Sequence, residues 1–216
     1  MVYVKASERE EQIIAAAVTV LGEVGVPATT LRGVAAEAGV PLGTLQYVFP
    51  TKDQLLRAVL TRVIHDISEA LRAHLELDKG VEHALRQGVS SFWDELVDNH
   101  IGLQIMQYEL MTYSLRSESG GLAQLQYESY CSVVTQFCEQ AAQSTGERCA
   151  VGFDTLGRLA LAQVDGLILQ YIAKPDAARA RRDLHQALDM LVLFADPQPV
   201  ARSATRRSSA VLAEAE

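Results

Sequence analysis

Histidine and cysteine, the side chains that most often bind metals or do chemistry, are scattered along this chain of 216 residues. None of the five histidines stands in an HxxxH or HExxH spacing, which would place two imidazoles on one face of a helix. The sequence also lacks a Ser/His/Asp order, a phosphate-binding loop and a dinucleotide-binding glycine motif. We therefore predict no metal site, no cofactor and no enzymatic activity.

The three cysteines, Cys131, Cys138 and Cys149, have no CxxC spacing and are an odd number, so they predict no disulfide framework. Cys131 and Cys138 are seven residues apart and share a face if their segment is helical. Small buried apolar residues in a reducing cytoplasm are one interpretation. A redox sensor that uses Cys131 or Cys138 is the alternative.

One carboxylate, Asp165, stands in an otherwise apolar segment. On a helix it shares a face with Leu161, Ile168 and Leu169. Because a carboxylate on an apolar face needs a partner, we expect Asp165 to pair with a ligand group, with a residue across a dimer interface or with a nearby cation. The sequence leaves these three partners open.

The elements that position these residues are predicted to be helices. Apolar residues recur at helical spacing almost throughout, and no convincing strand pair or internal repeat is present. Ser7 and Glu10 have the spacing of a capping box at the first helix, and Gly25 and Pro27 stop it. The predicted helices cover about 7–24, 31–38, 42–48, 52–77, 81–98, 100–115, 121–144, 154–173 and 176–194.

Residues 30–49 predict a helix-turn-helix, two short helices joined by a tight turn. Thr30 is placed to cap the first of them, and Gly39 ends it because glycine accepts a left-handed backbone. Ala35, four residues before Gly39, lets the two helices pass closely. The expected small core is formed by Val34, Val40, Leu45 and Val48.

The same segment carries a dense set of family motifs. They are Ala35-x-x-x-Gly39-Val40, Gly43-Thr44-Leu45, Tyr47, Phe49, Thr51-Lys52 and Leu55-Leu56. Over about residues 8–60 the chain thereby resembles the N-terminal domain of TetR-family transcriptional regulators. The resemblance implies an all-α fold of about nine helices, with a three-helix helix-turn-helix DNA-binding domain (7–51) before a larger helical ligand-binding and dimerisation domain (52–196). We expect the tail, residues 197–216, to be mostly disordered.

The resemblance also implies which residues contact DNA. The helix over 42–48 is expected in the major groove, and the lysine that follows it on a phosphate. Thr30 can offer its hydroxyl and nearby amides at a helix start to a phosphate, where the helix dipole also helps, and Arg32 can reach a phosphate or a base edge. The candidate DNA-binding residues are Thr30, Arg32, Leu42, Thr44, Gln46, Tyr47 and Lys52.

Two positions depart from the family pattern. Pro41 stands where the family commonly has a serine-like cap, which removes one amide that would bind phosphate. Gln46 stands where the family commonly has tyrosine. Glutamine can pair with adenine through two hydrogen bonds, so Gln46 either reads a base or faces solvent or a phosphate.

The charge balance is unusual for a DNA-binding protein. The net charge is −8, and residues 1–50 hold three cations and five acids. Bulk electrostatic attraction to DNA is therefore weak. We expect recognition to depend on local geometry, with modest non-specific affinity and a clear preference for the specific site.

The C-terminal part concentrates aromatic and sulfur-containing residues between positions 92 and 137, in a chain with only 6% aromatic residues. Such a cluster is typical of an adaptable apolar cavity between helices. We therefore expect a mostly apolar small-molecule effector. The candidate ligand-binding residues are Trp93, Met106, Met111, Tyr127, Tyr130 and Asp165.

The last two long helices are the predicted dimer face. Gly157, Ala160, Ala162 and Gly166 permit close helix contact, and in similar regulators two such helices from each subunit form a four-helix bundle. We see no apolar run long enough to span a membrane and no secretory signal, so we expect a cytoplasmic protein. The predicted helix face leads us to expect a homodimer.

Together these features predict a ligand-responsive regulator that binds a palindromic double-stranded DNA operator. Repression with release on ligand binding is the main hypothesis, and activation stays open because no residue fixes the sign. The alternative is an all-helical small-molecule binding protein, or a redox sensor, whose helix-turn-helix is only architectural.

Overall fold

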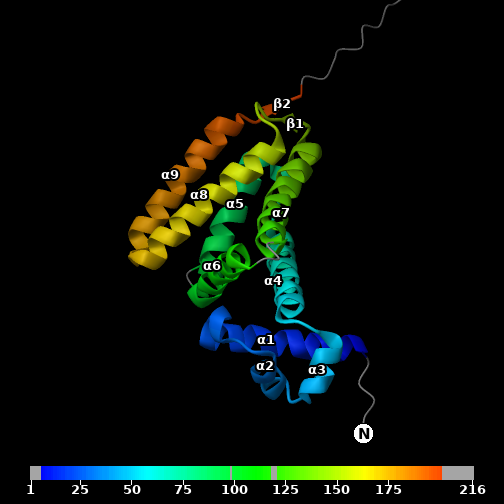
Figure 1. Ribbon diagram of the computed structural model, residues 1–216. Helices are drawn as coiled ribbons and strands as arrows, with labels where there is room; N and C mark the ends of the chain where they lie inside the picture. Colours follow the sequence, from blue (N-terminus) through cyan, green and yellow to red (C-terminus); the bar gives the residue numbers. More distant parts are fainter. Residues whose placement is uncertain (1–5, 98, 118–120, 201–216) are drawn as a thin grey trace, which may run out of the picture.

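The computed structural model describes residues 6–97, 99–117 and 121–200, and these are helical almost throughout (Figure 1). A 3₁₀ turn, η1 (Leu77–Lys79), precedes α5, and a π-helical turn, η2 (Trp93–Val97), extends it. The α-helices in the described part are α1 (Ala6–Ala28), α2 (Leu31–Glu37), α3 (Leu42–Val48), α4 (Lys52–His74), α5 (Val81–Phe92), α6 (Ile101–Arg116), α7 (Gly121–Thr145), α8 (Phe153–Ala173) and α9 (Ala177–Ala195).

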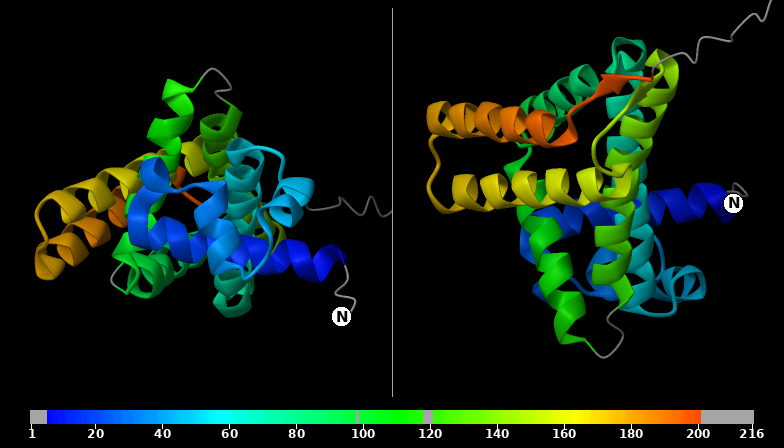
Figure 2. Two further views of the ribbon diagram at one scale, coloured as in Figure 1. Left: turned by 60° about the horizontal axis from the view of Figure 1, so that its bottom comes forward. Right: turned by 90° about the horizontal axis from the view of Figure 1, so that it is seen from above.

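The first three helices form one end of the molecule, below α4 and α6 in Figure 1. From that end α4 runs alongside α7, and α1 packs against both α4 and α6. The helices α8 and α9 lie side by side and antiparallel at the flank, as both views of Figure 2 show. The predicted all-α fold with an N-terminal helix-turn-helix and a larger helical part is confirmed.

The helix-turn-helix forms for the local reasons that its sequence suggests. The Thr30 hydroxyl accepts a hydrogen bond of 3.0 Å from the Gly33 amide and so caps α2. Gly39 has a φ of 62°, the left-handed conformation that its turn requires. From α1, the Gln12 side chain donates to the Ala38 carbonyl at 2.7 Å and holds the turn in place.

The core of this end is small and well packed. Val34, Val40 and Leu45 are buried, as expected, whereas Val48 is only partly buried. Ala35 and Phe49 are buried as well. These residues continue into one cluster with the apolar faces of α1 and α4. The helix-turn-helix is therefore held in position by an apolar core that it shares with α1 and α4.

Helix α1 loses its helical geometry at Gly25, where φ is 76° and ψ is 167°. Such angles are accessible almost only to glycine, so the predicted stop at Gly25 has a physical basis, although one further turn continues to Ala28. The predicted cap at Ser7 is wrong, because Ser7 lies inside the described helix α1. The expectation that no apolar segment is long enough to span a membrane is wrong for α1, which is long and apolar enough by length and composition alone. On one side of this helix, Ile13, Ala17 and Leu21 are buried in the core.

Helix α4 begins with a capping box. The Thr51 hydroxyl accepts from the Gln54 amide, and the Gln54 side chain accepts from the Thr51 amide, each at 3.2 Å. Its apolar residues, from Leu55 to Leu71, are buried. The helix ends at His74 rather than near 77, because Leu75 is already extended.

Two short strands were not expected. β1 (Glu147–Arg148) pairs antiparallel with β2 (Gln198–Pro199), and the Val200 amide donates to the Gly146 carbonyl at 2.7 Å. Residues 197–200 are thus ordered against the end of α7, which corrects the start of the predicted disordered tail. Residues 201–216 lie outside the described residues.

Candidate functional site

The outer face of α3 carries most of the residues that were predicted to contact DNA. Tyr47 is 89% exposed and Gln46 is exposed, while Leu42 and Thr44 are half-buried. On the opposite face of the same helix, Leu45 is fully buried. The helix thus turns one apolar side into the core and presents an uncharged polar and aromatic side to solvent.

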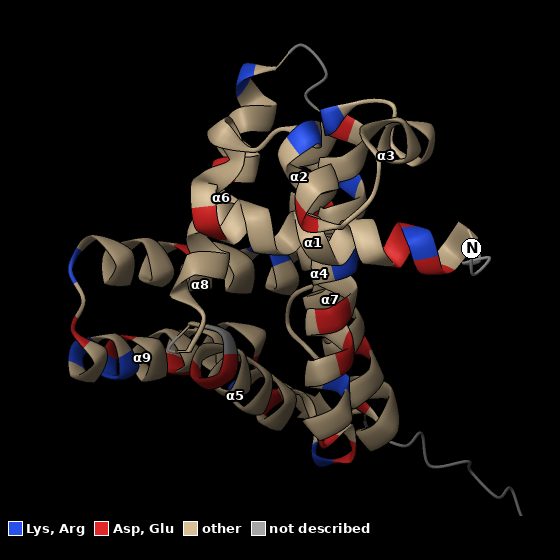
Figure 3. Ribbon diagram, turned by 90° about the horizontal axis from the view of Figure 1, so that it is seen from below, with Lys and Arg blue, Asp and Glu red and all other residues tan. Residues whose placement is uncertain are grey.

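Two further candidates flank this face. Arg32 on α2 is exposed, and Thr30 is exposed at the start of that helix although its hydroxyl already caps α2. Figure 3, which looks at this end of the molecule, shows basic residues beside α2 and no charged residue on α3. A nucleic-acid contact here would combine one flanking cation with hydrogen-bonding side chains of α3.

Lys52 is placed differently from the other candidates. Its Nζ donates to the Val26 carbonyl at 2.6 Å and lies 5.2 Å from the centre of the Tyr113 ring. Burial lowers the pKa of Lys52. Lys52 therefore links α1, α4 and α6 in this structure, and only its remaining ammonium hydrogens are available to a phosphate.

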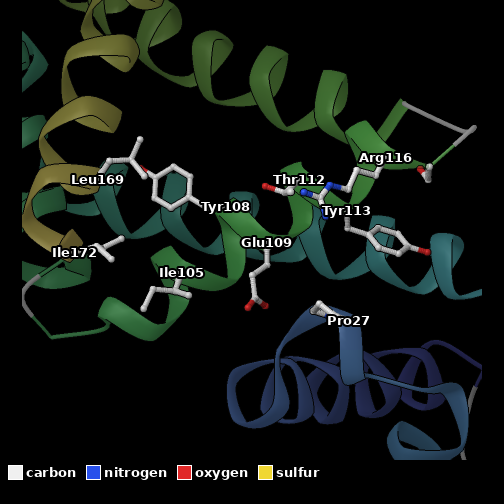
Figure 4. A pocket seen from close by; sticks show the side chains of 10 residues that line it. Pro27, Ile105, Tyr108, Glu109, Thr112, Tyr113, Arg116, Leu169 and Ile172 are labelled. Carbon is white, nitrogen blue, oxygen red and sulfur yellow. The ribbon is translucent and has the colours of Figure 1, made fainter.

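The same junction contains two more links to α6. The Glu109 carboxylate accepts from the Val26 amide at 2.8 Å, directly after the break in α1 at Gly25. The Tyr113 hydroxyl donates to the Asp53 carboxylate at 2.9 Å. Figure 4 shows Glu109 and Tyr113 on the side of α6 that faces the first three helices. Helix α6 is thereby tied to both α1 and α4.

A cleft of about 600 Å³ opens beside this junction. Pro27 lies on one side, Glu109 and Tyr113 on α6 form its floor, and Leu169 and Ile172 of α8 border it (Figure 4). The cleft is open to solvent and separates the end of α1 from α8.

A smaller cavity of about 50 Å³, which we call the inner cavity, lies between α5, α6, α7 and α8. Four of the predicted ligand-binding residues line it: Met111, Tyr127, Tyr130 and Asp165. Further lining residues that the sequence analysis did not select are Phe92, Gln104, Gln107, Tyr108 and Gln126. The structure thus brings most of the predicted set to one place.

The polar groups of the inner cavity form a short network. The Tyr130 hydroxyl donates to the Gln107 side-chain oxygen, and the Gln126 amide donates to the Gln107 carbonyl at 3.2 Å. The Tyr108 hydroxyl donates to the backbone carbonyl of Asp165 at 3.1 Å. Burial raises the pKa of the Asp165 carboxyl to about 6.

A second cavity, about 90 Å³ and almost wholly apolar, adjoins the inner cavity. Both are lined by Phe92, Tyr130, Leu161 and Val164. The second cavity extends between α4, α5 and α7. The more polar inner cavity and the apolar second cavity therefore meet at Phe92 and Tyr130.

Trp93 and Met106 lie elsewhere in the core and are not part of this lining. Trp93 is fully buried with Val164, Ile168 and Leu184, and its ring centre is 5.8 Å from that of Tyr171. Met106 is buried in the large cluster that includes α1 and α4. The structure gives both residues a packing role.

The cysteines show no sign of an activated thiolate. Burial raises the pKa of Cys138 to about 12 and also raises the pKa values of Cys131 and Cys149. Because the thiolate is the reactive form, these environments disfavour the redox-sensor alternative. Within the described residues, no group of three or more His, Cys, Asp or Glu side chains is arranged to hold a metal ion.

Comparison with known proteins decides the family. A family model described as bacterial regulatory proteins, tetR family, matches residues 13–59, which include the helix-turn-helix. The chain belongs to the TetR family of transcriptional regulators. It is accordingly a helix-turn-helix transcriptional regulator rather than an enzyme, of a family whose members bind operator DNA and small-molecule effectors.

Similar proteins extend over most of the chain. The nicotine-responsive transcriptional repressor HdnoR of Paenarthrobacter nicotinovorans is 24% identical over 80% of this chain and 88% of its own length. The regulator BetI of Burkholderia cenocepacia is 27% identical over 85% of this chain and 94% of its own length.

Solved structures agree in fold. A transcriptional regulator from Rhodococcus sp. Rha1 superposes with a TM-score of 0.70 at 24% identity, over 88% of this chain and 99% of that one. The multidrug binding protein EbrR, described in complex with imidazole, gives a TM-score of 0.62 at 26% identity over 90% and 98% of the two chains. TetR-type architecture thus covers both the DNA-binding end and the larger helical part.

Proposed function

We propose that this TetR-family protein is a cytoplasmic repressor that binds a palindromic operator as a homodimer and releases it when a small molecule occupies the inner cavity. In this proposal residues 7–51 read DNA and residues 52–196 bind ligand and dimerise. The exposed face of α3, on which Gln46 and Tyr47 are open to solvent, is the observation that carries the proposal.

Dimerisation through α8 and α9 is supported by apolar side chains that those helices leave in solvent. Leu193 is 81% exposed, and an exposed apolar patch usually marks an interaction surface. Pairing two subunits there would place two α3 helices on one DNA. They would have to lie about 34–36 Å apart to enter successive major grooves. The other exposed apolar residues of the two helices are Leu159, Leu169, Met190 and Phe194.

Coupling between ligand and DNA is assigned to α6. One side of this helix lines the inner cavity through Gln104, Gln107 and Tyr108. Its other side holds α1 and α4 through Glu109 and Tyr113. A ligand that shifts α6 therefore moves the DNA-binding end, and by linkage operator DNA weakens ligand binding by the same factor.

Names of similar proteins support a small organic effector. HdnoR is nicotine-responsive and EbrR is a multidrug binding protein. By analogy, the effector of this chain is expected to be a compact organic molecule that fits a partly apolar site.

The base-reading role of α3 is tested by Gln46→Ala. Binding is measured by fluorescence anisotropy on the fragment upstream of the protein's own gene and on variants changed at each half-site position. The proposal expects altered base preference at one position per half-site, because a bidentate base contact discriminates by about 1–3 kcal/mol. Uniform weakening on all sequences would mark Gln46 as a backbone contact, and unchanged binding would remove Gln46 from the interface.

A further inference from the structure

The inner cavity holds a carboxylate without an opposing charge in the described part of the chain. Asp165 lies on α8, and the same cavity is lined by Tyr108, Tyr130 and three glutamines. Arg158, on the same helix, is engaged by Asp154 at 2.9 Å. An ionised carboxylate inside a protein is costly unless a cation pairs with it.

Two buried side-chain amides in the same cavity each have one atom without a hydrogen-bond partner among the described residues. Gln104 and Gln126 are each 4% exposed. Gln104 Nε2, a donor, and Gln126 Oε1, an acceptor, have no hydrogen-bond partner among the described residues. Buried polar groups are nearly always paired, so this donor and this acceptor, together with the Asp165 carboxylate, indicate that a ligand completes the site.

Aromatic rings surround these polar groups. Phe92, Tyr108, Tyr127 and Tyr130 all line the inner cavity. The hydroxyls of Tyr108 and Tyr130 are occupied by hydrogen bonds within the protein, so what these residues can offer a ligand is chiefly the ring. The π-face of an aromatic ring attracts a cation.

From this combination we propose that the inner cavity binds the protonated amine of a compact organic cation, with Asp165 as its counter-ion. The inference rests on the proposed function, in which this cavity is the effector site, and names the chemical class of the effector. The ammonium donates to Asp165 and to Gln126 Oε1, and a hydrogen-bond acceptor on the same molecule takes the free donor of Gln104.

The adjoining apolar cavity accommodates the remainder of the molecule. It shares Phe92 and Tyr130 with the inner cavity and is also lined by aliphatic side chains such as Ile67 and Leu85. The two cavities are small, about 50 and 90 Å³. They suit an amine attached to one short or aromatic apolar group.

Three probes with one carbon skeleton test the charge requirement: 2-phenylethylammonium, 2-phenylethanol and phenylacetate. Their binding to the full chain is measured by titration calorimetry at pH 7.5. We expect the ammonium to bind at least tenfold more tightly than the alcohol, and phenylacetate to bind most weakly. Equal affinities of the ammonium and the alcohol, or no binding of the ammonium, would overturn the proposal.

Asp165→Asn tests the assigned counter-ion, because the amide keeps the shape of the carboxyl group and removes its charge. The variant is expected to lose the preference for the ammonium while it still binds 2-phenylethanol. Asp154→Asn, on the same helix but exposed, is the matched control and is expected to keep the preference. If Asp165→Asn also keeps it, the assignment is wrong.

Two measurements distinguish a ligand role of Asp165 from a role in the dimer, and a failure of this inference from a failure of the proposed function. Sedimentation of Asp165→Asn shows whether the carboxylate instead pairs with a second subunit: a dimer like that of the wild type supports the ligand role, and loss of the dimer contradicts it. Operator binding without any probe tests the proposed function by itself. A protein that does not bind its operator but binds the ammonium preferentially would refute the proposed regulator function and still support the cation site.

Discussion

Asp165→Asn is also predicted to stabilise the protein in a pH-dependent way. Burial raises the pKa of this carboxyl from an ordinary 3.8 to about 6. The folded protein therefore holds this proton more tightly than the unfolded chain does. Linkage then requires that the free energy of unfolding falls as pH rises from about 3.8 to 6 and stays reduced above that range.

The magnitude follows from the same two values. Since each tenfold change in proton affinity corresponds to about 1.4 kcal/mol, ionised Asp165 lowers stability by about 3 kcal/mol at pH 7.5. This figure is an upper one, because the side chain keeps some contact with solvent. For a chain of this size, 1 kcal/mol moves the Tm by about 2–4 °C, so the variant is expected to melt several degrees higher.

The assay is urea unfolding of wild type and variant at pH 4 and at pH 7.5, at one protein concentration because the chain is expected to dimerise. Asparagine should stabilise the protein at pH 7.5 and have little effect at pH 4. Asp154→Asn should do the opposite at pH 7.5, since hydrogen bonding to Arg158 lowers the pKa of Asp154. An equal gain at both pH values, or a loss at pH 7.5, would refute the argument.

Three further perturbations probe packing, dimerisation and coupling. A Cβ at Gly157 would lie 2.5 Å from the hydroxyl oxygen of Thr135, so Gly157→Ala should lower the free energy of unfolding by about 1–3 kcal/mol. A Cβ at Gly22 would have no atom within 4 Å, so Gly22→Ala should raise the free energy of unfolding by about 0.5–1 kcal/mol. Equal effects of the two substitutions would count against the α7–α8 contact. Leu193→Glu should convert the dimer to a monomer in sedimentation and reduce operator affinity at least tenfold, and a variant that stays dimeric would remove this part of α9 from the interface. Glu109→Ala should lower the factor by which 2-phenylethylammonium weakens operator binding toward one, and an unchanged factor would exclude this link from the coupling.

The helix-turn-helix was accessible from the sequence because its determinants are local. Thr30 caps α2 through a residue three positions away, and Gly39 supplies the left-handed conformation that the turn requires. The apolar spacing of α4 likewise fixes which side of that helix is buried. Short-range rules of this kind need no knowledge of tertiary structure.

The chemistry of the inner cavity could be predicted from the sequence only in part. Asp165 and three large side chains were selected by type, but glutamine is usually exposed, and nothing local reveals that Gln104 and Gln126 are buried. Their burial depends on how α6 meets α7. Likewise Trp93, the single tryptophan of the sequence, was assigned to the cavity, whereas it packs against α8 and α9 in another part of the core.

The junction between the two parts of the chain depends on contacts far apart in the sequence. Glu109 reaches Val26, and Tyr113 reaches Asp53, and neither pair follows from spacing. The two-residue strand β1 and its partner β2 are also too short to leave a pattern. Such contacts become visible only in three dimensions.

The central claim is tested most directly by titrating the full chain onto the DNA upstream of its own gene and counting the bound subunits. The account predicts that two subunits protect one palindrome, at least a hundredfold more tightly than they bind the same bases in scrambled order. Binding that is equal on both sequences, or a single subunit on the DNA, would contradict it.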